Sequence, residues 1–322
     1  MTSGLLIAFL LSAGLLVLFR RWADALGFID RPNERSSHSR PMPVGGGICF
    51  AIAITVVLTI QSLGSQATGE PPWVLCIAGI SVASVGLIDD RWGLPVWPRM
   101  LLYAGAAGAV VSLYFELFPP WGVLPLVLGV TWLINLVNFM DGSDGLVATQ
   151  VMAVCAGMAS IGFFMPDAGS LVALALLMMS ALLPFLWLNW PPATLFMGDS
   201  GAVFMGLYLG ALGFESWQVS ERMGYAWLAL MMPFLVDSGF TLLARGVRGR
   251  SLFLAHREHA YQRFLRDSDS PLLVVLGLLA IHGIWQFPCA LIIVQSSYSP
   301  EVAVFFSTIP SLVVVTYLWL RK

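Results

Sequence analysis

Long apolar stretches, separated by short polar segments, constrain this 322-residue chain more than any other feature. The chain is 58% hydrophobic and only 11% charged, whereas a soluble domain carries about 25% charged residues to cover its surface. About 20 consecutive apolar residues cross a membrane as a helix. We therefore predict a single all-α domain over residues 1–322, a polytopic membrane helix bundle with about eleven spans, near 3–19, 45–63, 72–88, 100–118, 122–138, 146–164, 170–188, 201–214, 225–243, 272–294 and 300–320.

The basic residues predict how this bundle lies in the membrane. If every gap between spans is a turn, alternate loops share a face, and 15 of the 16 Lys and Arg residues fall on the face of the C-terminus. Only Arg222 falls opposite. The positive-inside rule then places the C-terminus in the cytoplasm and the N-terminus in the periplasm. Because Arg20 and Arg21 follow the first span and no basic residue precedes it, we interpret it as a retained helix and not as a signal peptide.

Five polar segments on the predicted cytoplasmic face hold nearly all the acidic groups that could do chemistry. They are residues 30–40, Asp89-Asp90-Arg91, NFMDGSDG at 138–145, NWPPATLFMGDSG at 189–201, and residues 245–266. Carboxylates are ligands for hard cations such as Mg²⁺, and Mg²⁺ commonly accompanies phosphate. The sequence therefore predicts a site for phosphate chemistry assembled on one membrane face.

Adjacent or closely spaced carboxylates mark two of these segments. Asp89 and Asp90 close the third span, where the helix dipole disfavours anions. Neighbours in a helix point about 100° apart, so we expect one of them near a metal ion and the other near a substrate phosphate. Asp141 and Asp144 would share a face if their turn were helical, and an Asx-type turn with an N-cap is the alternative.

The segment at 189–201 is the most specific of the five. Asp199 could hold Mg²⁺ while the backbone amides after it face the phosphates, and Phe196 could stack on a base. Asp237 lies inside the ninth span, so it is either a site residue or a helix-to-helix hydrogen-bonding group.

The histidines and cysteines carry weaker signals. His256 and His259 have a spacing that suggests zinc, but neither a Cys nor a third ligand supports it. We interpret His282 as a hydrogen-bonding residue that faces the bundle. All four cysteines lie inside apolar spans without ligand spacing, as buried small hydrophobic residues do.

Taken together, the motifs DRPNERSSH, PVGGG, the DD after the third span, NFMDGSDG and NWPPATLFMGDSG resemble those of polyprenyl-phosphate N-acetylhexosamine-1-phosphate transferases, glycosyltransferase family 4. The resemblance implies transfer of a sugar phosphate from a UDP-sugar to undecaprenyl phosphate, with release of UMP. It implies Mg²⁺ as cofactor, with Mn²⁺ as a substitute, and Asp199 as the metal ligand. It also implies catalytic roles for Asp89, Asp90 and His259, and substrate contacts from Arg40, Asn138, Asp141, Asp144, Asn189, Phe196, His256 and Arg257.

The last loop points to one branch of that family. Its HREHAYQ sequence resembles the O-antigen-initiating enzymes more than the peptidoglycan enzyme. The expected substrate is thus a UDP-N-acetylhexosamine, 6-deoxy forms such as N-acetylfucosamine or N-acetylquinovosamine included, in lipopolysaccharide biosynthesis at the bacterial inner membrane. A phospho-muramoyl-pentapeptide transferase is the alternative. The expected partners are the UDP-sugar, undecaprenyl phosphate and membrane lipid, with no nucleic acid, and a homodimer is left open.

Other membrane proteins fit the pattern less well. A secondary transporter would place its polar residues near mid-membrane, whereas here they gather on one face. An intramembrane aspartyl protease would need two Asp residues inside helices, and Asp237 alone qualifies. Another class of lipid phosphotransferase uses DGxxAR, and Asp141-Gly142 is not followed by Ala-Arg.

Overall fold

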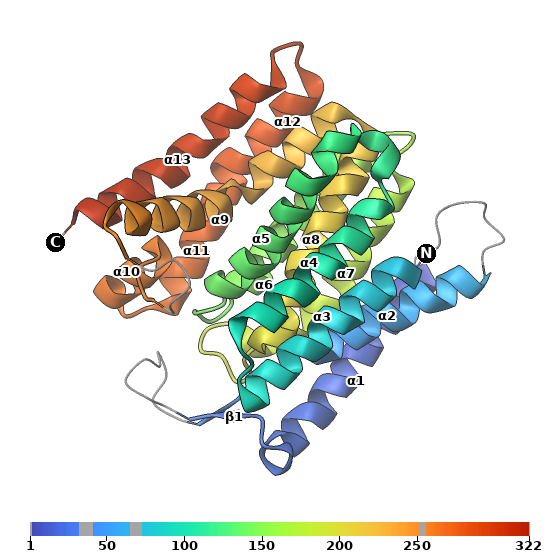
Figure 1. Cartoon of the computed structure of the whole chain (residues 1–322), viewed down its shortest axis with the longest axis vertical. Helices are drawn as coiled ribbons and strands as arrows, with labels where there is room; N and C mark the ends of the chain where they lie inside the picture. Colours follow the sequence, from blue (N-terminus) through green and yellow to red (C-terminus); the bar gives the residue numbers. More distant parts are fainter. Residues whose placement is uncertain (1, 32–40, 65–72, 251–255, 322) are drawn as a thin grey trace.

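The computed structural model describes residues 2–31, 41–64, 73–250 and 256–321, which are almost entirely helical (Figure 1). The first half contains α1 (Thr2–Leu26), α2 (Gly47–Gly64), α3 (Trp73–Trp92), α4 (Val96–Ser112), the 3-10 turns η1 (Phe115–Leu117) and η2 (Pro120–Gly122), α5 (Val123–Met140) and α6 (Leu146–Gly162). The second half contains α7 (Gly169–Asn189), α8 (Gly198–Val219), α9 (Glu221–Val247), α10 (Ala260–Ser268), α11 (Pro271–Ile281), the π-helical turn η3 (His282–Gln286), α12 (Phe287–Gln295) and α13 (Pro300–Leu320). Two short antiparallel strands, β1 (Ile29–Asp30) and β2 (Met42–Pro43), pair between α1 and α2. The predicted all-α class is confirmed.

Every predicted apolar stretch is helical, but fewer helices meet a strict test for a membrane span. In the described part of the chain, seven helices are long and apolar enough to cross a membrane: Thr2–Leu26, Trp73–Trp92, Pro120–Met140, Gly169–Asn189, Glu221–Val247, Pro271–Gln295 and Pro300–Leu320. α2 and α6 are apolar but shorter, and α4 has 17 residues. The glycines and Asp199 of α8 lower its hydropathy. The chain is a multi-pass membrane protein, while the count of eleven spans and the orientation of the termini stay predictions.

Helix α8 lies in the middle of the bundle. Every residue from Ser200 to Phe214 is buried, as expected of a helix with apolar residues all round. It packs against α3, α5, α9 and α2. At Gly206 a Cβ would lie 2.6 Å from the Cα of Ile134, so the backbones of α8 and α5 approach closely there. The glycines that make α8 a weak span by hydropathy are thus what let other helices surround it.

The C-terminal helices form a second group beside this centre (Figure 1). α13 packs against α9, α12 and α10. α11, η3 and α12 follow one another without a break, which matches the single predicted span at 272–294. His282, buried in this segment, lies with its Nε2 2.8 Å from Oε1 of Gln150 in α6. This bond confirms the prediction that His282 faces the bundle.

Backbone and side-chain bonds draw the polar segments together at one end of the bundle, which we call the polar end. Figure 1 shows the loops after α1, α3, α5 and α7 gathered there. The N–H of Phe196 donates to the carbonyl of Pro43 at 2.9 Å, which joins the segment before α8 to β2. The predicted clustering of the motif segments is therefore present in the described residues.

Candidate active site

The PVGGG and FMGDSG segments meet backbone to backbone at the start of α8. Gly46 and Gly47 donate their N–H groups to the carbonyls of Phe196 and Met197, at 3.0 and 2.9 Å. A Cβ at Gly47 would lie 2.2 Å from the Cα of Gly201, so no side chain fits between these segments. The glycines of PVGGG thus let the entry to α2 lie directly against the backbone at the start of α8.

Asp90 caps α8 from the end of α3. Its carboxylate accepts the N–H groups of Asp199 at 2.8 Å and Ser200 at 3.4 Å. A carboxylate at a helix N-terminus satisfies amides that would otherwise lack partners. The sequence predicts that the amides after Asp199 face a substrate phosphate; in the structure one of them, the amide of Ser200, donates to Asp90, because α3 ends beside α8.

Arg99 links two of the candidate carboxylates, and the sequence analysis did not select it. From the first turn of α4 its guanidinium forms a short ion pair with Asp89 and lies 3.3 Å from the carboxylate of Asp199. The N–H of Leu94 also donates to Asp89. Asp89 and Asp90 thus point to different partners, as their angular separation predicts. The feature of the sequence that could have identified Arg99 is its position as a single arginine directly before the apolar stretch at 100–118.

Negative charge accumulates around Asp199. The Asn138 side chain lies within hydrogen-bonding reach of its carboxylate. Burial, followed by the charges of Asp90 and Asp144, raises the pKa of Asp141 to about 7. Among the residues that the structure describes, no three His, Cys, Asp or Glu side chains form a group that could hold a metal ion by themselves. The arrangement instead offers the half-buried carboxylate of Asp199, the side-chain amide of Asn138 and a surplus of negative charge.

Asn189 and Asp144 tie two of the motif segments together. The N–H of Gly145 donates to Oδ1 of the buried Asn189, and Nδ2 of Asn189 donates to the carbonyl of Leu195, both at 2.9 Å. Asp144 accepts the N–H of Ala193, also at 2.9 Å. Residues 141–145 are not helical, so this contact follows from a turn and not from a shared helix face. The structure gives Asn189 and Asp144 a part in shaping the loops, and their predicted substrate contacts stay predictions.

Asp237 caps α10, which settles what its buried carboxylate contacts. It accepts the N–H groups of Ala260 at 2.8 Å and Tyr261 at 3.1 Å. Nδ1 of His259 lies 3.4 Å from the same carboxylate. Of the two alternatives that the sequence leaves open, the hydrogen-bonding one matches these contacts, although the partner is the start of a short helix and not a neighbouring span. Asp237 therefore positions the last loop.

The aromatic side chains of that loop stack and then reach the NFMDGSDG segment. The ring of His259, which is buried, stacks on His256 at 4.9 Å and on Tyr261 at 5.9 Å between centroids. The hydroxyl of Tyr261 donates to the carbonyl of Phe139 at 3.2 Å. A Cβ at Gly142 would lie 2.3 Å from the hydroxyl oxygen of Tyr261. Burial, with the nearby charges of His259 and Arg245, lowers the pKa of His256 to about 4. Tyr261, on which His259 stacks, thus forms a wall beside the NFMDGSDG segment that contains Asp141.

Three residues remain among those that the sequence predicts to contact substrate. Phe196 is half-buried just before α8, and Arg257 is exposed on the last loop. Arg40 lies outside the described residues. The four cysteines are free; Cys49, Cys76 and Cys155 are buried, as the sequence predicts, whereas Cys289 is half-buried.

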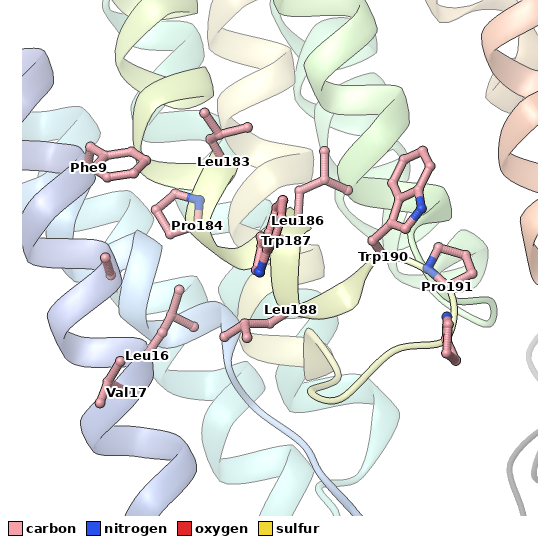
Figure 2. A pocket seen from close by; sticks show the side chains of 12 residues that line it. Phe9, Leu16, Val17, Leu183, Pro184, Leu186, Trp187, Leu188, Trp190 and Pro191 are labelled. Carbon is pink, nitrogen blue, oxygen red and sulfur yellow. The ribbon is translucent and has the colours of Figure 1, made fainter.

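An apolar cavity lies near these loops, separate from the carboxylates. It measures 880 Å³ and lies between α1 and α7, with residues such as Leu16, Trp187 and Trp190 in its wall (Figure 2). No charged side chain lines it. Its apolar lining suits acyl chains, whereas the charged and polar side chains of the motif segments lie at the polar end.

Comparison with known proteins supports this assignment. Residues 72–216 match the model for glycosyl transferase family 4. The chain is 29% identical over 316 residues to decaprenyl-phosphate N-acetylglucosaminephosphotransferase of Mycobacterium tuberculosis, covering 84% of this chain and 77% of the relative. It is 25% identical over 290 residues to a probable undecaprenyl-phosphate N-acetylglucosaminyl 1-phosphate transferase of Bacillus subtilis, covering 84% and 78%. It is 27% identical over 320 residues to undecaprenyl-phosphate alpha-N-acetylglucosaminyl 1-phosphate transferase of Yersinia pestis, covering 88% and 84%. The resemblance in the loop motifs is confirmed: residues 72–216 match glycosyl transferase family 4, and these relatives carry names of polyprenyl-phosphate N-acetylglucosamine-phosphotransferases.

Proposed function

We propose that this protein transfers an N-acetylhexosamine 1-phosphate from a UDP-sugar to undecaprenyl phosphate and releases UMP. The observation that carries the proposal is the cluster of Asp90, Asp141 and Asp199 with Arg99 at one end of an apolar bundle. A nucleotide sugar arrives from water and a polyprenyl lipid from the membrane, and the end of a membrane bundle is open to both. The activities in the names of the relatives support the same reaction.

We also infer a requirement for Mg²⁺, with Mn²⁺ as a substitute. Mg²⁺ in phosphate-transfer sites is often bound by one or two carboxylates and completes its shell with water and substrate phosphates. Asp199, with Asn138 beside it, suits such a partial ligand set, and a cation would offset the crowding that raises the pKa of Asp141. When bound, the ion would neutralise charge on the pyrophosphate.

The residues at the site favour direct attack by the lipid phosphate. A phosphate monoester has a second pKa near 6, so it is largely dianionic at neutral pH and needs little help from a base. One of its oxygens attacks the sugar-bearing phosphorus, and the new P–O bond forms as the bond to UMP breaks. UMP leaves with the electron pair. Arg99 supplies positive charge beside Asp89 and Asp199, where two anions must meet.

For the sugar, we propose an N-acetylhexosamine, 6-deoxy forms included, and a role in initiating O-antigen on the cytoplasmic face of the inner membrane. The HREHAYQ loop supports this branch over the peptidoglycan-type alternative. Purified protein should be given undecaprenyl phosphate and a panel of UDP-sugars, UDP-N-acetylmuramoyl-pentapeptide included. UMP release and the mass of the lipid product then identify the substrate, and a panel that yields no UMP from any sugar would refute the proposed reaction.

The metal assignment has its own test, the substitution Asp199→Asn. Asn keeps the shape of the side chain, and Asp90 still accepts the backbone N–H of residue 199, so the protein should fold. Loss of the charge should lower turnover by orders of magnitude and shift the Mg²⁺ dependence of the remainder to higher concentration. Asp167→Asn, at an exposed carboxylate between α6 and α7, is the control. If the Asp199→Asn protein keeps the same metal requirement, Asp89 or Asp90 would have to be the metal ligand instead.

A further inference from the structure

Two arginines from different helices lie over one indole ring at the C-terminal end of α13. The guanidinium carbon of Arg263, in α10, is 4.0 Å from the ring centroid of Trp319, and that of Arg248, just after α9, is 4.7 Å away. Trp319 is buried, whereas Arg248 is exposed. A cation over an aromatic face is a stable pair, but two cations on one ring repel each other. A group other than the indole ring should therefore help to hold the two guanidinium groups close together.

Positive charge around this ring exceeds the negative charge available to balance it. Glu258 pairs with Arg245 and Arg250, and Asp267 pairs with Arg321. In the part of the chain that the structure describes, neither Arg248 nor Arg266 has a carboxylate within ion-pair distance. The pKa of Arg263 is lowered, first by burial and next by the nearby charge of Arg266, to which Arg248 and Arg250 add. The cluster thus has the charge of a site for an anion.

The same cluster lies where the apolar surface of the bundle ends. Leu243 and Val247 in α9 are 73% and 90% exposed, and Leu320 in α13 is 78% exposed, as expected of side chains that face lipid tails. Arg248 and Arg321 follow directly after them in sequence. Charged groups at such a boundary meet the headgroup layer of the membrane.

We propose that Arg248, Arg263 and Trp319 form a binding site for the phosphate of a membrane-anchored lipid. Guanidinium groups donate paired N–H bonds to phosphate oxygens, and an anion bound by both arginines offsets their mutual repulsion. The tail of such a lipid would lie along the exposed apolar face of α9 and α13. This site is built at the ends of α9 and α13 and on α10 (Figure 1), whereas Asp89, Asp90, Asp199 and Arg99 are held by α3, α4 and α8. α10 also carries Tyr261, which contacts the NFMDGSDG segment, so the two sites use different side chains but share one helix.

The phosphate could belong to a bulk anionic phospholipid or to the polyprenyl phosphate, and a lipid-binding experiment separates them. The protein in detergent is titrated with phosphatidylglycerol, undecaprenyl phosphate or phosphatidylcholine, without nucleotide sugar, and retained lipid is counted by native mass spectrometry. We expect tighter retention of one or both phosphate-bearing anionic lipids than of phosphatidylcholine. The double substitution Arg248→Gln/Arg263→Gln should weaken that retention roughly thirty-fold, from the usual contribution of two arginines near a membrane surface.

Matched variants keep the experiment decisive. Arg21→Gln removes an arginine that lies 6.0 Å from the ring of Trp22 at the end of α1, and it should leave retention unchanged. The Arg248→Gln protein lacks only an exposed side chain, so it should fold and should show part of the loss of lipid retention. Loss for undecaprenyl phosphate alone assigns the site to the monoester, and loss for both lipids assigns it to phosphate in general. Equal retention of all three lipids, or equal loss in Arg21→Gln, would overturn the proposal.

Discussion

Arg99 contacts the carboxylates of two residues that are 110 positions apart in the sequence, Asp89 and Asp199. In the substrate-free protein its guanidinium offsets their charge. In the proposed reaction the same charge would face the phosphates. One side chain can serve both purposes because the carboxylates and the substrate are attracted to the same positive group.

Replacing Arg99 should separate these two effects. Arg99→Gln should lower turnover by roughly 100-fold, since removing a group that stabilises developing negative charge typically costs this much. Arg99→Lys should recover part of the loss, because it restores the charge but not the planar fork. The measurement is UMP release at saturating Mg²⁺. Arg91→Gln, an exposed arginine at the end of α3, is the control, and equal activity of Arg99→Gln and this control would exclude Arg99 from the reaction.

The raised pKa of Asp141 predicts that the stability of the folded protein depends on pH. Its pKa rises from 3.8 to about 7 on folding, so folding favours the protonated form. The favourable contribution is complete below pH 3.8 and is lost as the pH rises through about 7. Without Mg²⁺ and substrate, the melting temperature should therefore fall between pH 5 and pH 8. Asp141→Asn should flatten this fall and Asp167→Asn should not, and an equal slope in Asp141→Asn would show that the carboxylate titrates normally.

At the scale of elements, α10 is a nine-residue helix held in place by contacts with α9 and α5. Asp237 of α9 supplies its cap, and Tyr261 fastens it to the carbonyl of Phe139 at the end of α5. A helix this short is marginal in isolation. Its position over the NFMDGSDG segment therefore depends on α9.

Removing that cap should loosen α10 without unfolding the bundle. Asp237→Ala should increase amide hydrogen exchange in residues 256–268 and raise KM for the UDP-sugar, because the wall next to Asp141 is no longer fixed. Asp237→Asn keeps one acceptor oxygen and should show a smaller effect. Hydrogen exchange in α1 and α7 serves as the internal reference. Unchanged exchange in residues 256–268 would mean that Asp237 does not position α10.

The helices were largely predictable from the sequence, and the contacts of the site were not. Apolar stretches of about 20 residues specify helices locally, so each of the eleven predicted stretches matches one. α10 has no such stretch, and its amphipathic pattern of nine residues lies within a basic loop. The Asp90 cap joins residues 109 positions apart, a pairing that only the packing of α3 against α8 creates. The residue types at the site were therefore predictable, while the partner of each carboxylate was not.

At the scale of the whole molecule, the direction of the bundle in the membrane follows from charge. The predicted orientation places the polar end in the cytoplasm. A cysteine at exposed position Asp269, after α10, should react with a membrane-impermeant maleimide only in opened cells. A cysteine at exposed position Asp167, between α6 and α7, should react in intact cells. The reverse pattern would place the polar end outside.

The cap that Asp90 provides for α8 also bears on how the protein is synthesised. The ribosome adds Asp90 to the chain 109 residues before the amide of Asp199, and α10 comes later still. During that interval the carboxylate of Asp90 lacks the two amides from which it accepts hydrogen bonds in the finished protein. An unfinished chain therefore has no complete substrate pocket, and enzymatic competence begins only when the C-terminal third has been inserted.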